Sequence, residues 1–78
     1  MTEIVYAGYG YSNQVNDVTD KVKQQYRSGM REFKGLDSEY GDPSVGNIKS
    51  LYIVWQNAQG VKDSGVSIEQ KVSVKLPD

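Results

Sequence analysis

Three acids in a glycine-rich stretch, Asp37, Glu39 and Asp42, are the residues with the clearest potential for chemistry. Two carboxylates at a suitable separation form the catalytic pair of most glycosidases. The chain contains no histidine and no cysteine, so the commonest general base and the strongest nucleophile are both absent. A chain of 78 residues also offers little scaffold for a catalytic cleft. We therefore expect a protein that is not an enzyme and that needs no cofactor.

The same three acids, Asp37, Glu39 and Asp42, could instead bind Ca²⁺, a hard cation that takes carboxylate and carbonyl oxygens. Their spacing does not match an EF-hand loop, and aspartate in such a segment commonly forms turns. Zinc lacks the cysteine and histidine ligands that it prefers. We expect a solvated acidic loop here and no metal site.

Tyrosine is frequent in this chain, which has six tyrosines and one tryptophan. Both side chains combine a flat apolar surface with a polar group, which suits stacking on sugars and anchoring of protein partners. Tyr26, Tyr52 and Trp55 lie on apolar stripes of predicted regular elements, so we expect them in the core. Other residues lie beside glycine-rich loops, where binding residues concentrate. These candidate ligand-binding residues are Tyr9, Tyr11, Asn13, Tyr40 and Asp42.

The charge and hydropathy patterns narrow the range of partners. The net charge is −1, and nine basic residues are interspersed with ten acidic ones. Without a basic stripe we expect no binding to nucleic acid. No apolar stretch approaches the roughly 20 residues of a membrane-spanning helix. The absence of cysteine and of a signal-peptide pattern predicts a cytoplasmic protein, with secretion of a processed chain as the alternative.

The hydrophobic pattern predicts four strands, over residues 3–11, 30–34, 48–55 and 66–76. The third strand is apolar on both faces, which is typical of a central strand covered on both sides. The last strand alternates apolar and polar residues and should have one face in water. Glycine, aspartate, serine and proline predict a loop over residues 35–47 and turns at residues 57–60 and 63–65.

One short helix is predicted near residues 18–28. Val18, Val22 and Tyr26 recur at helical spacing and form a narrow apolar stripe. Asn16 or Asp17 can cap the start, and Gly29 lies just after the expected end. The alternative is a strand through residue 18 followed by a looser turn.

These elements predict a mainly β protein, with α+β as a possible class. A small antiparallel sheet or β-sandwich would carry the one short helix. No pattern of parallel strands with helical crossovers is present. We expect residues 1–78 to form a single domain. Its small core and open sheet edge favour self-association, as a symmetric dimer.

Three segments occur in fixed order: Ala7–Gly10 followed by Asp17–Thr19 and Val22, then Tyr40–Pro43 with Gly46, then Lys49, Leu51 and Val54, closing with Glu69 and Leu76–Pro77. Together they resemble an uncharacterised β-rich domain at the C-terminus of one branch of J-domain (DnaJ-like) proteins. The pattern extends over nearly the whole chain. Its most specific part is the Gly-Asp-Pro loop followed by a lysine and an apolar strand. The resemblance implies a β-rich fold and a non-enzymatic role. The chain has no J-domain, so recruitment of a chaperone is not implied.

The sequence thus predicts a small binding protein. Its first expected activity is lectin-like carbohydrate binding through the aromatic and polar loops, because sugars need a ring to stack on and polar groups to bond their hydroxyls. The alternative is a protein–protein interaction module or a homo-oligomer building block, which would use the same aromatic residues or an exposed strand edge.

Overall fold

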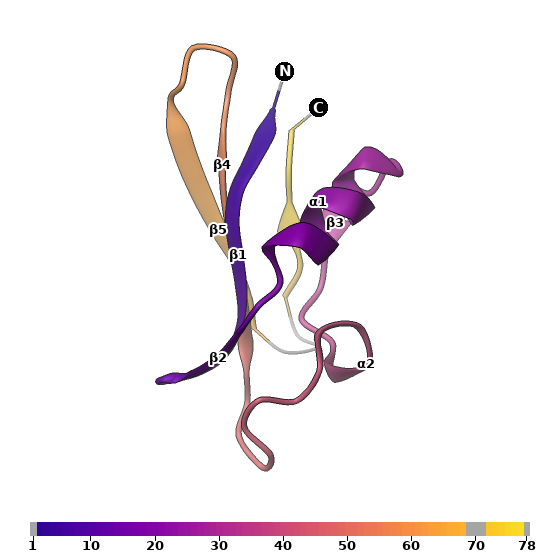
Figure 1. Ribbon diagram of the computed structural model, residues 1–78, viewed down its shortest axis with the longest axis vertical. Helices are drawn as coiled ribbons and strands as arrows, with labels where there is room; N and C mark the ends of the chain where they lie inside the picture. Colours follow the sequence, from indigo (N-terminus) through magenta and orange to yellow (C-terminus); the bar gives the residue numbers. More distant parts are fainter. Residues whose placement is uncertain (1, 69–71, 78) are drawn as a thin grey trace.

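The computed structural model describes residues 2–68 and 72–77. Its larger sheet is antiparallel and has the spatial order β2 (Gln14–Asp17), β1 (Glu3–Tyr11), β4 (Ser50–Gln56) and β5 (Lys62–Ile68). A smaller sheet pairs β3 (Glu32–Phe33) with β6 (Val74–Lys75), and the helices are α1 (Thr19–Arg27) and α2 (Asp37–Tyr40). Helix α1 and the strands β3 and β6 lie on one side of the four-stranded sheet (Figure 1). The prediction of a mainly β fold with a small antiparallel sheet and a short helix is confirmed.

The core lies between the four-stranded sheet and the elements on that side, which we call the inner side. Its buried apolar residues are Ile4, Ala7, Tyr9, Val18, Val22, Phe33, Tyr40, Leu51, Ile53, Trp55, Val74 and Leu76. The expected core position of Trp55 is confirmed, and Phe33 on the short strand β3 is also fully buried. The expected core position of Tyr52 is wrong, because its side chain projects from the opposite face and is 47% exposed. Strand β4 is central, as predicted, but only one of its faces is covered by described elements.

Strand β1 contains a bulge that changes which residues face the core. Its pairing with β4 shifts register between Ile4 and Tyr6, which makes Val5 an extra residue. A bulge of this kind offsets the alternation of side chains on the two sides of it. Ile4 and Ala7 are consequently both buried, whereas Val5 is exposed, although strict alternation would place residues 5 and 7 on the same face.

The predicted helix near residues 18–28 is confirmed as α1. The stripe that predicted it faces the core: Val18 and Val22 are buried, and Tyr26 packs against their cluster at the margin. Gly29 follows the helix with a φ of 110°, a conformation that glycine adopts without steric cost. The residues before the helix form the short strand β2, which sequence reasoning considered only as an alternative.

The single strand predicted over residues 66–76 is wrong, because β5 and β6 belong to different sheets. Val66 and Val74 were expected on the same face of that strand, but Val66 is 43% exposed and Val74 is 5% exposed. Ser67, expected on a wet face, is buried, and its hydroxyl accepts a hydrogen bond from the backbone N–H of Gly35 at 2.9 Å. The polar parity of this segment therefore faces inward in β5.

The hairpin between β4 and β5 confirms one predicted turn and contradicts the other. At residues 57–60, Oδ1 of Asn57 accepts hydrogen bonds from the backbone N–H groups of Gln59 and Val61, at 2.9 and 3.0 Å. Residues 63–65 do not form a turn but lie within β5, paired with β4. Neither helix in the described part of the chain is long and apolar enough to cross a membrane.

Candidate functional site

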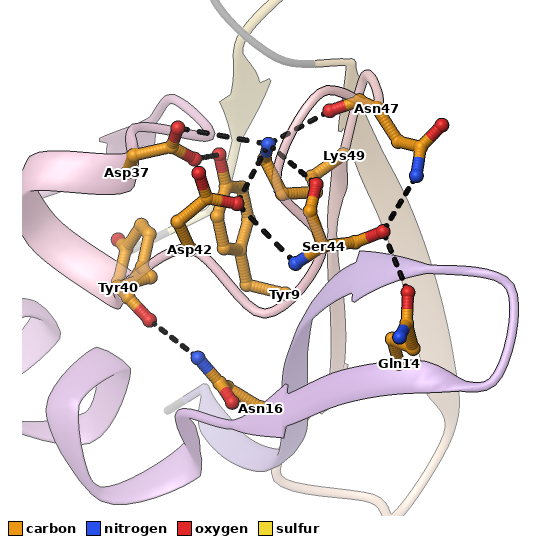
Figure 2. A network of polar contacts seen from close by, with 9 residues as sticks. All are labelled: Tyr9, Gln14, Asn16, Asp37, Tyr40, Asp42, Ser44, Asn47 and Lys49. Atoms are coloured by element: carbon orange, nitrogen blue, oxygen red, sulfur yellow. Dashed lines mark hydrogen bonds and ion pairs between the residues drawn. The ribbon is translucent and has the colours of Figure 1, made fainter.

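A buried lysine organises the long loop between β3 and β4 (Figure 2). The side chain of Lys49 is 3% exposed, and its Nζ lies 2.9 Å from Oδ1 of Asp42 and 3.6 Å from Oδ2 of Asp37. The same Nζ donates hydrogen bonds to the backbone carbonyl oxygens of Ser44 and Asn47, at 3.2 and 2.7 Å. The ammonium group therefore sits beside two carboxylates and joins distant points of the loop.

Two of the predicted ligand-binding tyrosines belong to the interior, so their expected surface positions are wrong. Tyr9 is fully buried, and its hydroxyl donates a hydrogen bond to Oδ1 of Asp37 at 2.6 Å. Tyr40 is 6% exposed, and its hydroxyl donates to Oε1 of Gln25 at 2.8 Å. The two rings lie 5.5 Å apart with a tilt of 47°. Tyr9 faces inward from β1, and the helical turn α2 directs Tyr40 toward the same core.

The loop is also bonded to β2. Asn16 Nδ2 donates to the carbonyl oxygen of Tyr40 at 3.0 Å, and the Ser44 hydroxyl donates to Oε1 of Gln14 at 2.7 Å. Burial raises the pKa of Tyr40 to about 12, although its hydrogen bond to Gln25 acts in the opposite direction. The polar groups of this network mainly satisfy one another, which favours a structural role for the loop.

The five predicted ligand-binding residues do not form one exposed aromatic site. Asp42 has a partly exposed carboxylate, but that carboxylate is ion-paired with Lys49. Tyr11 and Asn13 are exposed at the turn between β1 and β2. Tyr9 and Tyr40 contact each other inside the core. The five candidates are therefore divided between the interior, the loop network and a hairpin turn.

The acids considered for Ca²⁺ are also separated. Asp37 and Asp42 approach the ammonium of Lys49, while Oε2 of Glu39 lies 3.8 Å from Nζ of Lys21. Within residues 2–68 and 72–77, no group of three acidic side chains is placed to hold a metal ion.

A hollow of about 540 Å³ lies beside α1, where Lys23, Arg27 and Arg31 are among its lining residues. Arg31 has a role in the fold there. Its guanidinium carbon lies 3.7 Å from the centre of the Tyr26 ring, and its Nη1 donates to the carbonyl oxygens of Tyr26 and Met30, each at 2.8 Å. Arg31 thus supports the C-terminal end of α1.

The second candidate site is an apolar surface on the side of the four-stranded sheet opposite α1, which we call the outer face. All four strands contribute to it, and its apolar side chains are Tyr6, Val15, Tyr52, Val54, Val66 and Ile68. Five of the six are between 41% and 47% exposed, and Val54 is intermediate. No described element packs on this face (Figure 1).

Strand pairing brings the two outer tyrosines together. A Cβ atom at Gly8 would collide with the hydroxyl of Tyr6, so the Tyr6 side chain extends over Gly8. Gly8 pairs with Tyr52 on β4, and Tyr52 pairs with Val66 on β5. The glycine thus leaves room for the Tyr6 side chain beside Tyr52, and an aliphatic residue continues the row.

The centre of the outer face has no charged side chain among the described residues. Its polar positions there are Ser50 and Ser64. Glu3 and Lys62 lie in one row at the end of the sheet, each paired with Gln56. An uncharged, tyrosine-containing centre with charges at its margin is typical of a protein interface.

Sequence reasoning missed the buried Lys49 and the uncovered outer face, although the sequence contained a signal for each. Lys49 has the same parity as Leu51 and Ile53, so a lysine at an inward position follows an acidic loop. The outer residues Tyr52 and Val54 were recognised as a second apolar face of this strand, but that face was expected to be covered.

No protein-family model, no curated protein and no solved structure matches this chain. The resemblance to the C-terminal domain of DnaJ-like proteins therefore stays a prediction. The structure relates two residues of its most specific segment, since Asp42 and Lys49 form the ion pair within the loop. Glu69, another residue of the resemblance, lies outside the described residues.

Proposed function

We propose that this chain is a non-enzymatic protein-interaction module that binds its partner through the outer face. The observation that carries this proposal is an apolar surface contributed by four strands, uncharged at its centre and left uncovered by the described elements. Its six apolar side chains together expose on the order of 400 Å², within the range of the largest patches on monomeric proteins, which are often functional.

The residue types on this face suit a protein partner. Tyrosine is enriched among the residues that dominate binding energy, because it offers a large rigid surface together with a polar group. Tyr6 and Tyr52 supply two such anchors near the middle of the face. The aliphatic residues Val54, Val66 and Ile68 surround Tyr52.

Carbohydrate binding receives less support than the sequence predicted. The rings of Tyr9 and Tyr40 pack in the core and offer no free stacking surface. Tyr52 on the outer face has mainly aliphatic neighbours, whereas sugar recognition needs amide, carboxylate or similar groups beside the ring. A protein partner makes better use of these neighbours.

Comparative cross-linking in cell extract tests the proposal, with wild-type protein and two variants. Tyr52→Lys places a charge in the middle of the outer face, and Val45→Lys places one on the loop at a residue that is 83% exposed. We expect the wild type and Val45→Lys to cross-link to the same partner, which can be another protein or a second copy of this chain. We expect Tyr52→Lys not to cross-link to that partner.

Equal cross-linking by all three proteins would contradict the use of the outer face. A glycan-array screen supplies the opposing result. Sugar binding that is lost in Tyr11→Ala and kept in Tyr52→Lys would overturn the proposal in favour of the loops and turns.

A further inference from the structure

We infer that the partner on the outer face is a second copy of this chain, packed sheet against sheet across a two-fold axis that runs along the strands. This inference rests on the proposed function and names its partner. Two antiparallel sheets commonly stack about 10 Å apart with their strands within about 30° of each other, and their facing side chains interdigitate. The dimer would thus be a sandwich of two four-stranded sheets.

The strand register shows why the face is complementary to itself. A two-fold axis along the strands keeps each row of residues at its own level and reverses the order of the strands across the interface. In the row of Gly10, Val15 lies at one edge and Ile68 at the other. The reversal places Val15 of each copy opposite Ile68 of its mate, so two exposed aliphatic side chains cover each other.

The next row brings the tyrosines together. Tyr52 and Gly8 are neighbours on the two central strands. Reversal of the strand order places Tyr52 of one copy over Gly8 of the other, where the ring of Tyr6 lies. Tyr52 therefore meets Tyr6 across the interface, which is an aromatic contact at its centre.

The charged residues at the end of the sheet favour the same orientation, with the two-fold axis along the strands. Glu3 on β1 and Lys62 on β5 are separated by Gln56 on β4. With the axis along the strands, Glu3 of one copy lies about one strand spacing, roughly 5 Å, from the position opposite Lys62 of the other. An axis across the strands would instead bring Lys62 against the apolar Ile68 row. The Glu3 and Lys62 charges thus favour the parallel arrangement, in which Asp17 at the β2 edge lies opposite Val66 of the other copy.

The size of the face sets the expected strength. Strands β4 and β5 have seven residues each, which span roughly 23 Å, and the four strands together are roughly 19 Å wide. Because β2 has only four residues, the footprint is at most about 400 Å². A standard stable interface removes about 800 Å² from each partner, so this dimer belongs to the weak class with a dissociation constant on the order of 10 µM.

Sedimentation velocity from about 1 µM to about 1 mM brackets that value and tests the inference. We expect the wild type to pass from monomer to dimer over this range. Tyr52→Lys should raise the dissociation constant by about 30-fold or more, as expected for an aromatic anchor at an interface centre. Val45→Lys should leave it unchanged. Far-ultraviolet circular dichroism shows whether each variant is folded.

A charge exchange tests the orientation with two exposed residues whose replacement leaves the core intact. Glu3→Lys and Lys62→Glu should each weaken the homodimer, since each places like charges opposite one another. A mixture of the two variants should associate about as tightly as the wild type, because opposite charges then meet at both ends of the row. Equal weakness of the mixture and of the separate variants would overturn the parallel arrangement.

Hydrogen exchange separates this dimer from one formed by the open edge of β5. Edge pairing would protect the β5 backbone N–H groups that point away from β4, whereas face packing gives them no new partner. New protection of these amides on dimer formation would overturn the inference. So would a wild type that stays monomeric near 1 mM. If the wild type stays monomeric but cross-links to a different protein, and Tyr52→Lys abolishes this cross-link, the proposed function stands without the homodimer. If the wild type cross-links to no protein, both the homodimer and the proposed function are wrong.

Discussion

The inner and outer faces of the four-stranded sheet carry similar residue types in opposite environments. On the inner face Tyr9 and Leu51 are fully buried, while on the outer face Tyr52 and Val66 are 47% and 43% exposed. Tyr9 and Tyr52 lie on the two central strands, which pair along most of their length. The difference arises from what lies across from each face: α1, β3 and β6 on one side, and no described element on the other (Figure 1).

This comparison shows that apolar residues on both faces of a strand do not identify the covered face. The inner face combines apolar packing with a polar network around Lys49, which anchors the loop. The outer face has apolar side chains without such a network at its centre. This composition is the observation on which the proposed intermolecular contact rests.

The largest contrast is expected from alanine substitution of the two tyrosines. Tyr9→Ala should destabilise the fold by about 3–5 kcal/mol, because it removes a fully buried ring and leaves a cavity. Tyr52→Ala should cost under about 1 kcal/mol, since the ring is half exposed in the monomer. Urea denaturation at a concentration well below that of dimer formation measures both. Equal losses of stability would contradict the assignment of the two faces.

The next largest effect is expected from Lys49→Met. This change keeps an unbranched side chain but leaves Asp37 and Asp42 without the ammonium that faces them. Removing one partner of a fully buried ion pair costs 3–5 kcal/mol, and we expect about 2 kcal/mol here because each carboxylate is about one-third exposed. Lys34→Met, at an exposed position, is the control and should be nearly neutral. A neutral Lys49→Met would show that the network does not stabilise the loop.

Alkaline pH should weaken the inner face through Tyr40. Burial raises the pKa of this phenol to about 12, so the folded state favours the protonated form. The stability from this group is fully present below the ordinary pKa of 10 and is lost as the pH rises from 10 toward 12. Ultraviolet titration should show a tyrosine ionisation near pH 12 that is missing in Tyr40→Phe. Identical titration curves for the wild type and Tyr40→Phe above pH 11 would contradict the burial of this phenol.

The smallest effect is expected at Asp17, at the β2 edge of the outer face. Its Oδ1 accepts hydrogen bonds from the hydroxyl and the backbone N–H of Thr19, at 2.6 and 3.0 Å, and these bonds lower the pKa of the carboxyl. The stability that they supply is present above the ordinary pKa of 3.8 and is lost as the pH falls through the lowered value. Asp17→Asn should slightly lower the thermal midpoint at pH 7, and the difference from wild type should shrink in acid. A constant difference would assign the effect to something other than ionisation.

Local patterns in the sequence determined several elements correctly. The apolar stripe of Val18 and Val22 predicted α1, the apolar run before Trp55 predicted β4, and Asn57 with the residues after it predicted a turn. Each of these depends on the conformation of a few adjacent residues. Backbone geometry relates such residues directly to helical or strand spacing, so no distant contact is needed to recognise them.

The tertiary structure alone decided which side chains are covered and which distant residues meet. The alternation of side chains along each strand predicted which residues share a face with Tyr9 and which with Tyr52. The position of α1 determined which of the two faces became the interior. The ion pair of Lys49 with Asp42 required the intervening loop to fold back on itself. Burial depends on the element that lies across from a residue, and strand periodicity contains no information about that element. The sequence therefore determined several local elements, whereas long-range packing decided the core and left the outer face uncovered by any described element.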